Sequence, residues 1–104
     1  MKAYISIGNS DDKLSQKKWR QFLGDVRSEC YTFAQEIQGI WFSEPVSPFQ
    51  NACFCVELHD DNVEEFKDTL RRLAHIYGQD SVTFDEVPTT VLLVPSKDRA
   101  GTTT

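Results

Sequence analysis

Three residues that could bind a metal lie on one short segment. Cys53, Cys55 and His59 are each separated by an odd number of residues, so an extended strand would place all three on the same face. Zinc requires ligands that converge tetrahedrally on the ion. At the usual rise along a strand, Cys53 and His59 would lie ~20 Å apart. One strand cannot wrap them around a single ion, so we expect no metal and no cofactor.

Thiol chemistry is the second option that the sequence offers. A cysteine nucleophile needs a neighbouring base, and the two histidines are His59 and His75. His75 falls off the apolar stripe of its predicted helix, and Cys30 falls on the core stripe of another, so we expect no catalytic residue of this kind. The three cysteines are an odd number, and an i, i+2 pair on a strand makes a poor disulfide. Reduced thiols favour a cytoplasmic location.

The charged residues exclude two classes of partner. Sixteen acidic against eleven basic residues give a net charge of −5, which is unlike the basic face of a nucleic-acid-binding protein. The basic cluster at residues 13–20 is too small to suggest DNA, and the acids at residues 60–65 suit a helix N-terminus. No apolar run approaches the ~20 residues that cross a bilayer. We therefore expect neither nucleic acid nor membrane as a partner.

The elements that position these residues follow from hydrophobic periodicity. Strict alternation predicts strands at residues 2–8 and 51–59. In the second strand we expect Phe54, Val56 and Leu58 to pack against the helices, at Phe22, Val26, Phe66, Leu70 and Leu73. Its other face then carries Cys53 and Cys55. The pattern of residues 37–44 predicts a further strand. Residues 82–87 are extended and half-polar. The apolar run at residues 89–94 is typical of a strand buried on both sides.

Two apolar stripes at helical spacing predict helices at residues 15–34 and 63–77. Ser15 is the expected N-cap of the first helix, and Gly78 the expected C-cap of the second. Asn62 and Glu65 resemble a capping box, and Asp68 is spaced to pair with Arg72.

The resulting order, β-α-β-β-α-β, is typical of an α+β, ferredoxin-like sandwich. It predicts a four-stranded antiparallel sheet with two helices on one face. We assign residues 1–95 to this single domain and residues 96–104 to a flexible C-terminal tail. Many unrelated functions share this fold, so the fold alone names none of them.

Several short motifs follow one another at suggestive spacing. Residues 4–10 read YISIGNS, residues 41–46 read WFSEPV, residues 49–52 read FQNA and residues 88–94 read PTTVLLV. In this order, from about residue 4 to 94, the chain resembles hydroxymethyl-dihydropterin pyrophosphokinase, the folate-pathway kinase. That family opens with an apolar strand running into Gly-Ser-Asn, whereas the last two residues are inverted here. The chain ends before the later C-terminal portion of the family, so it resembles a truncated member.

The departures from this family concern its catalytic chemistry. The family holds two Mg²⁺ ions with the aspartates of an Asp-Leu-Asp strand, and the matching residues here are Leu92 and Val94. Neither side chain can bind a hard cation, which phosphoryl transfer needs. The family's arginines match Gln79, Ser81 and Thr89. The resemblance therefore implies a catalytically degenerate pseudoenzyme with no catalytic residues.

Part of the pterin-binding pattern of the family is retained. Gly8, Ser43, Phe49 and Asn51 match positions that line its pterin pocket. Phe49 could stack on a flat heterocycle, and Asn51 offers a donor and an acceptor to a ring edge. The same residues also suit a turn, a core position and a strand start, so a purely structural role stays open.

We interpret the chain as a protein-binding domain whose partner is an unknown protein or a second copy in a homodimer. The predicted contact surface is the sheet face without helices, which we call the open face; it carries Tyr4, Ser6, Cys53, Cys55 and Glu57. Because an unpaired buried carboxylate is costly, Glu57 should lie at the rim or pair with a cation such as Lys2. A monomer whose open face is covered by the tail or by residues 82–87 is the alternative. Binding of a small flat heterocycle, and phosphotransfer at a rearranged site, are the other functions considered.

Overall fold

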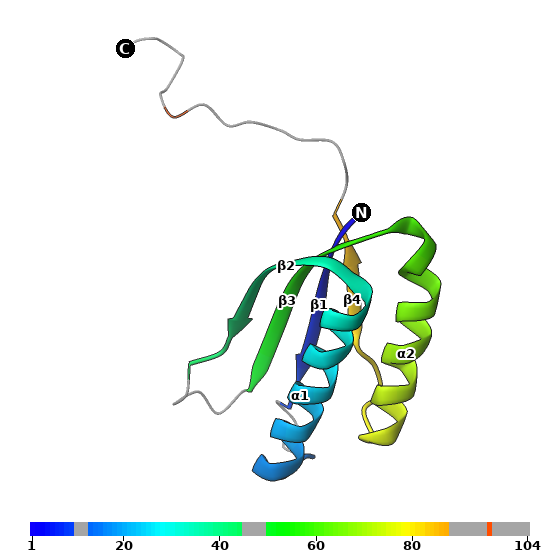
Figure 1. Cartoon of the computed structure of the whole chain (residues 1–104). Helices are drawn as coiled ribbons and strands as arrows, with labels where there is room; N and C mark the ends of the chain where they lie inside the picture. The colour runs from blue at the N-terminus through cyan, green and yellow to red at the C-terminus, as the bar shows by residue number, and fades with distance from the viewer. Residues whose placement is uncertain (10–12, 45–49, 88–95, 97–104) are drawn as a thin grey trace.

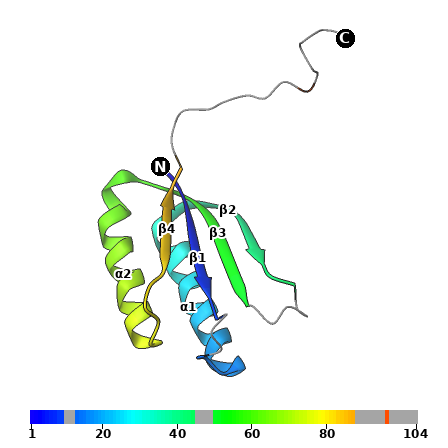
Figure 2. The ribbon, with the colours of Figure 1, turned by 180° about the vertical axis from the view of Figure 1, so that it is seen from behind.

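The structure, a computed structural model, describes residues 1–9, 13–44, 50–87 and 96. Its elements are β1 (Lys2–Gly8), α1 (Gln16–Phe33), β2 (Ala34–Phe42), β3 (Asn51–Leu58), a 3-10 turn (Asp60–Asn62), α2 (Val63–Ile76) and β4 (Thr83–Glu86). The strands form one antiparallel sheet in the order β2-β3-β1-β4. Both helices cover one face of this sheet (Figure 1), and Figure 2 shows the face that they leave open. The predicted ferredoxin-like fold is confirmed.

The central strand β3 has the predicted register. Phe54, Val56 and Leu58 are fully buried, whereas Cys53 and Cys55 on the opposite face are half-buried. The buried side chains form one cluster with the predicted helix residues, which are Phe22, Val26, Phe66 and Leu70, and Leu73 packs against its margin. Alternation in β3 therefore separates an apolar core from an open face.

The first helix begins as predicted. The Ser15 hydroxyl accepts a hydrogen bond from the Lys18 backbone N–H at 3.2 Å, which satisfies one of the amides that a helix N-terminus leaves unpaired. The buried residues of α1 fall on one stripe and are Trp19, Phe22, Val26 and Cys30.

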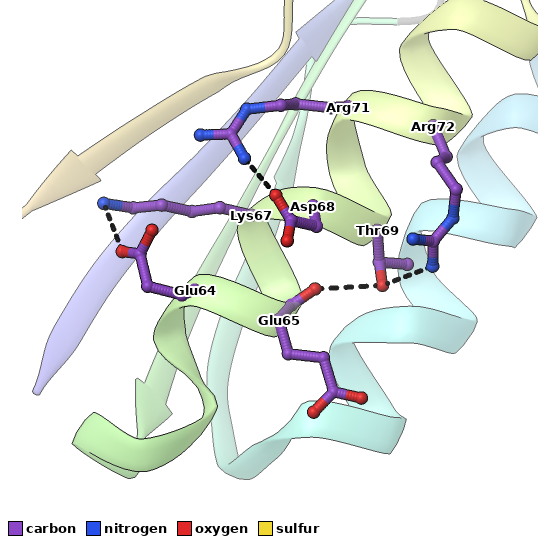
Figure 3. Close-up of polar contacts among 7 residues, drawn as sticks. All are labelled: Glu64, Glu65, Lys67, Asp68, Thr69, Arg71 and Arg72. Atoms are coloured by element: carbon purple, nitrogen blue, oxygen red, sulfur yellow. Dashed lines mark hydrogen bonds and ion pairs between the residues drawn. The ribbon is translucent and has the colours of Figure 1, made fainter.

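The second helix corrects two predictions about its polar contacts. The Asn62 side chain does not cap α2; it donates to the Phe33 carbonyl at 3.4 Å and so ties the helix start to the end of α1. Asp68 pairs with Arg71, one turn away at i+3, and Arg72 instead donates to the Thr69 hydroxyl (Figure 3). Gly78 follows the helix with φ +65°, which fits the predicted glycine cap.

The fourth strand of the sheet is the half-polar segment. β4 pairs with β1 from Ala3↔Glu86 to Ser6↔Thr83, so it extends the sheet at its edge. The alternative in which residues 82–87 cover the open face is therefore wrong. The strand predicted at residues 89–94 and the tail from 97 onward lie outside the described residues. β2 begins three residues earlier than predicted, because the chain passes directly from α1 into β2.

One hydrogen bond between the helices gives a pH-dependent prediction. The Tyr77 hydroxyl donates to Asp25 Oδ2 at 2.5 Å, and this bond is the main cause that raises the pKa of Tyr77 from 10.0 to about 12. A raised pKa means that the protonated phenol stabilises the fold below pH 10.0, and that this contribution is lost as the pH rises towards about 12. We expect Tyr77→Phe to be less stable than the wild type at neutral pH, with a difference that shrinks over this interval. Urea unfolding at a series of pH values measures it, and Tyr31→Phe, at an exposed position, is the control.

Candidate functional site

Three residues of the predicted pterin-like pocket lie together where β1, β2 and β3 meet. Gly8 is the cross-strand partner of Asn51. The Ser43 backbone N–H donates to the Asn51 carbonyl at 2.9 Å, and the Asn51 backbone N–H donates to the Ser43 hydroxyl at 3.0 Å. The fourth residue, Phe49, lies outside the described part of the chain. Gly8, Ser43 and Asn51 therefore lie together, held by strand pairing and by hydrogen bonds between Ser43 and Asn51.

A side chain at Gly8 would collide with this cluster. A Cβ atom there would lie 2.5 Å from Asn51 Oδ1 and 3.5 Å from the Gln50 carbonyl oxygen. Glycine therefore permits the close approach of the Asn51 side chain.

This contact predicts a specific effect of adding one methyl group. We expect Gly8→Ala to displace the Asn51 side chain and to lower the free energy of unfolding by about 1 kcal/mol. Gly39→Ala is the matched control, because a Cβ at Gly39 meets nothing within 4 Å. Urea unfolding gives the stability, and the NMR resonances of the Asn51 side-chain amide report its displacement. An unmoved Asn51 resonance in Gly8→Ala would contradict the prediction.

A buried asparagine beside this cluster was missed by sequence reasoning. Asn9 is 1% exposed; its Oδ1 accepts from the Leu14 backbone N–H at 2.9 Å, and its Nδ2 donates to the Leu14 carbonyl at 3.0 Å. The Asn9 Nδ2 also donates to Gln50 Oε1 at 3.0 Å, and its backbone N–H donates to the Gln50 carbonyl at 2.7 Å. Gln50 in turn exchanges side-chain amide hydrogen bonds with Gln16. Asn9 therefore joins the start of α1 to the start of β3.

The open face carries two exposed aromatic side chains. Tyr4 is 41% and Trp41 is 57% exposed. Tyr4 lies opposite Cys55, while Ser6, Cys53 and Trp41 form one row across three strands. Trp41 is a member of this surface that sequence reasoning did not place, because the face of a β2 residue depends on two register shifts in that strand.

The carboxylate of Glu57, on the open face, is paired. The terminal ammonium of Met1 lies 2.7 Å from Glu57 Oε2, so the predicted cation is Met1 rather than the Lys2 side chain. Glu57 is opposite Lys2 near one end of the strand pair, with a side chain 33% exposed. The register also places Asp85 opposite Tyr4 and Glu36 opposite Glu57, so carboxylates flank the uncharged row of Ser6, Cys53 and Trp41.

The three thiols differ in burial. Burial, and secondarily the charge of Glu29, raise the pKa of the Cys30 thiol to about 12, so little thiolate forms at neutral pH. Cys53 and Cys55 are half-buried on the open face.

Alkylation of the native protein tests this difference. We expect iodoacetamide to modify Cys53 and Cys55 first, and Cys30 only after unfolding in urea, because the reagent needs an accessible thiolate. Mass spectrometry of the peptides locates each adduct, and the urea-unfolded chain is the control in which all three sites react. Alkylation of Cys30 in the native protein at the rate of the other two would contradict its burial.

The remaining candidate groups do not come together. Among the described residues, no group of three or more His, Cys, Asp or Glu side chains is arranged to hold a metal ion. No helix in the described part of the chain is long and apolar enough to span a membrane.

Comparison with protein-family models and with curated proteins finds no match for this chain. The functional interpretation therefore rests on the geometry above and on the motifs of the sequence.

Proposed function

We propose that the chain is a non-catalytic, pyrophosphokinase-like domain that binds a protein partner through its open face in the cytoplasm. The exposed pair Tyr4 and Trp41, with Cys53 and Cys55 between them, supports this proposal. Aromatic side chains are enriched at protein interfaces because each contributes a large apolar area with few rotatable bonds. The paired carboxylate of Glu57 near one end matches the polar rim that surrounds such contacts.

A second copy of the chain is the first partner to test. In a two-fold dimer the same patch meets itself, and the uncharged row of Ser6, Cys53 and Trp41 supplies the apolar part of that contact. The three free thiols are compatible with a reducing compartment.

Sedimentation at micromolar concentration tests the homodimer. We expect a dimer mass for the wild type and a monomer mass for Cys55→Arg, because the new charge would be buried without a partner at the contact. Ile76→Arg is the control, since Ile76 is 69% exposed on α2, away from the open face. A monomer mass for the wild type at every concentration would exclude the homodimer.

The absence of pyrophosphokinase activity is a separate part of the proposal. It rests on Leu92 and Val94 at the positions that match the metal-binding aspartates of the family. We expect no AMP from ATP that depends on both Mg²⁺ and hydroxymethyl-dihydropterin. AMP formation with that dependence would instead support the phosphotransferase with a rearranged site.

A second candidate function is supported by the cluster of Gly8, Ser43 and Asn51. These residues match the pterin-lining positions of the resembled family; Ser43 and Asn51 are hydrogen-bonded to each other, and Gly8 lies opposite Asn51 in the strand pair. Under this alternative, a flat heterocycle stacks on Phe49 and bonds to the Asn51 amide. Calorimetric titration with hydroxymethylpterin tests this alternative. Binding that is lost in Asn51→Ala but kept in Asn62→Ala supports a remnant pocket. The absence of any heat of binding to the wild type excludes it.

A further inference from the structure

A cavity of about 590 Å³ lies between α2 and β4, outside both sites discussed above. The two elements run side by side in both views (Figures 1 and 2). Leu70 and Ala74 from α2, with Val82 and Phe84 from the β4 side, supply its apolar lining. The cavity is therefore a groove along one edge of the sheet, with these apolar side chains and a larger number of polar ones in its lining.

The floor of this groove borders an edge strand with unpaired backbone groups. β4 is the last strand of the sheet, and no described strand pairs with its outer side. The Val87 backbone N–H donates inward to the Lys2 carbonyl at 2.9 Å. Because hydrogen-bonding direction alternates along a strand, Phe84 and Glu86 direct their backbone groups outward. An added strand could pair with these groups.

The helical wall of the groove carries a row of basic side chains. Lys67, Arg71 and His75 line the cavity at intervals of four residues. Figure 3 shows Lys67 and Arg71 extending to the same side of α2, whereas Arg72 extends to the opposite side. The Lys67 ammonium lies 3.9 Å from Glu86 Oε1 and 5.0 Å from the centre of the Phe84 ring, so it reaches across to β4.

The groove presents two cations, Lys67 and Arg71, that are paired with carboxylates at its margin: Lys67 with Glu64 and Glu86, and Arg71 with Asp68. Among the residues that line it, Asp80 is the one acid, and its side chain is 97% exposed and lies 3.8 Å from Lys13. The neighbouring carboxylates Glu64 and Asp68, which contact Lys67 and Arg71, are also more than half exposed. A ligand carboxylate can therefore compete for both cations.

The spacing of the basic row matches an extended chain. Residues four apart on a helix are displaced by ~6 Å along its axis. Side chains two apart on a strand are displaced by ~6.7 Å. A strand added to β4 would thus present every second side chain to α2, in step with Lys67 and Arg71.

We propose that this groove binds an extended segment of a partner protein with an acidic residue at every second position. The segment adds a fifth strand to the sheet at β4, its backbone pairs with Phe84 and Glu86, and its carboxylates contact Lys67 and Arg71. Backbone pairing supplies affinity, and the alternate side chains supply specificity, as in other strand-addition complexes. This surface is separate from the open face, so a chain bound at each is compatible with the proposed function.

The test uses acetyl-Glu-Val-Glu-Val-Glu-amide as a probe of the full chain by NMR titration. We expect the amide resonances of Phe84 and Glu86 to shift most. The Asp85 amide, which points towards β1, should shift less. The matched peptide with Lys in place of each Glu should bind at least tenfold more weakly, because it meets like charges.

Variants of α2 distinguish binding at the groove from a general effect of the charge of the protein. Lys67→Glu together with Arg71→Glu should lower the affinity for the Glu-containing peptide at least tenfold. Arg72→Glu, on the other side of α2, should leave this affinity unchanged. Circular dichroism checks that each variant is folded, and the wild-type titration decides the outcome if the double variant is not. Equal binding of the Lys peptide, shifts confined to Cys53 and Cys55, or no shift at millimolar peptide overturns the proposal. Cys55→Arg, which should disrupt the open face, should leave the peptide titration unchanged. Failure of peptide binding at the groove can therefore be told apart from failure of the open-face interaction.

Discussion

Phe54→Ala is expected to lose most of the stability of this domain. Phe54 is fully buried at the centre of β3, opposite Ile5 and within the same cluster as Phe22 and Phe66. Removing a buried aromatic ring costs about 3–5 kcal/mol, because the transfer energy is lost and a cavity remains. Since small domains are stable by only about 5–15 kcal/mol, this loss is a large fraction of the free energy of unfolding, and a domain at the low end of that range would be close to its midpoint.

Urea unfolding followed by circular dichroism measures this effect. Cys53→Ala is the matched control, because Cys53 is the preceding residue of the same strand and its side chain lies on the open face. We expect that control to change the free energy of unfolding by less than about 1 kcal/mol. If Cys53→Ala costs as much as Phe54→Ala, the register of β3 is wrong by one residue.

The contrast between these neighbours explains why much of the fold was predictable. A central strand that is buried on one face must alternate, and β3 does so over its whole length. The helices are equally constrained, since α1 buries one stripe from Trp19 to Cys30. Where burial has a simple period, sequence alone identifies the element and its buried face.

The edges of the sheet were harder to predict for a physical reason. β4 is four residues long and mostly exposed, so it carries little hydrophobic signal. The apolar run at residues 89–94 carries a stronger hydrophobic signal and therefore predicts a buried strand. In β2, register shifts between Ala34 and Glu36 and between Ile37 and Gly39 interrupt the alternation. Trp41 could not be assigned to the open face without those shifts.

The cluster of Gly8, Ser43 and Asn51 was predictable only in part. Gly8 and Asn51 end one strand and begin another, and adjacent antiparallel strands bring such positions together. Asn9 gave no hydrophobic signal, and a polar residue after glycine is ordinarily read as an exposed turn. Its burial depends on partners in two distant segments, at Leu14 and Gln50. Pairing between distant polar groups leaves no periodic trace in a sequence.

Asn9→Asp is the second substitution expected to have a large effect. Aspartate keeps the shape and can still accept from the Leu14 N–H, but it cannot donate to the Leu14 carbonyl or to Gln50 Oε1. A carboxylate at a position 1% exposed would also face the Leu14 carbonyl oxygen. Losing two donated hydrogen bonds and desolvating a charge should cost about 3 kcal/mol or more at neutral pH.

The pH dependence of this loss has a definite sign. Burial disfavours the charged form, so the pKa of the introduced carboxyl should rise above the ~3.9 of a solvated aspartate. A protonated carboxyl can again donate one hydrogen bond. The variant should therefore be closest to the wild type in acid and should lose stability as the pH rises through the raised pKa. Urea unfolding of both proteins across this range provides the measurement.

Asn62→Asp is the matched control for this prediction. Asn62 is half-buried at the start of α2, where the helix dipole favours a negative charge. The change gives up one hydrogen bond, the 3.4 Å bond to the Phe33 carbonyl, so it should cost less than at Asn9. A deficit in Asn9→Asp that is absent at neutral pH, or that grows in acid, would exclude the buried polar role. Because Asn9 binds Gln50, the residue before Asn51, its loss should also shift the Asn51 backbone amide in the molecules that remain folded. Such a shift, without a change in the amide resonances of α2, would place the strain at the cluster of Gly8, Ser43 and Asn51 rather than in the core.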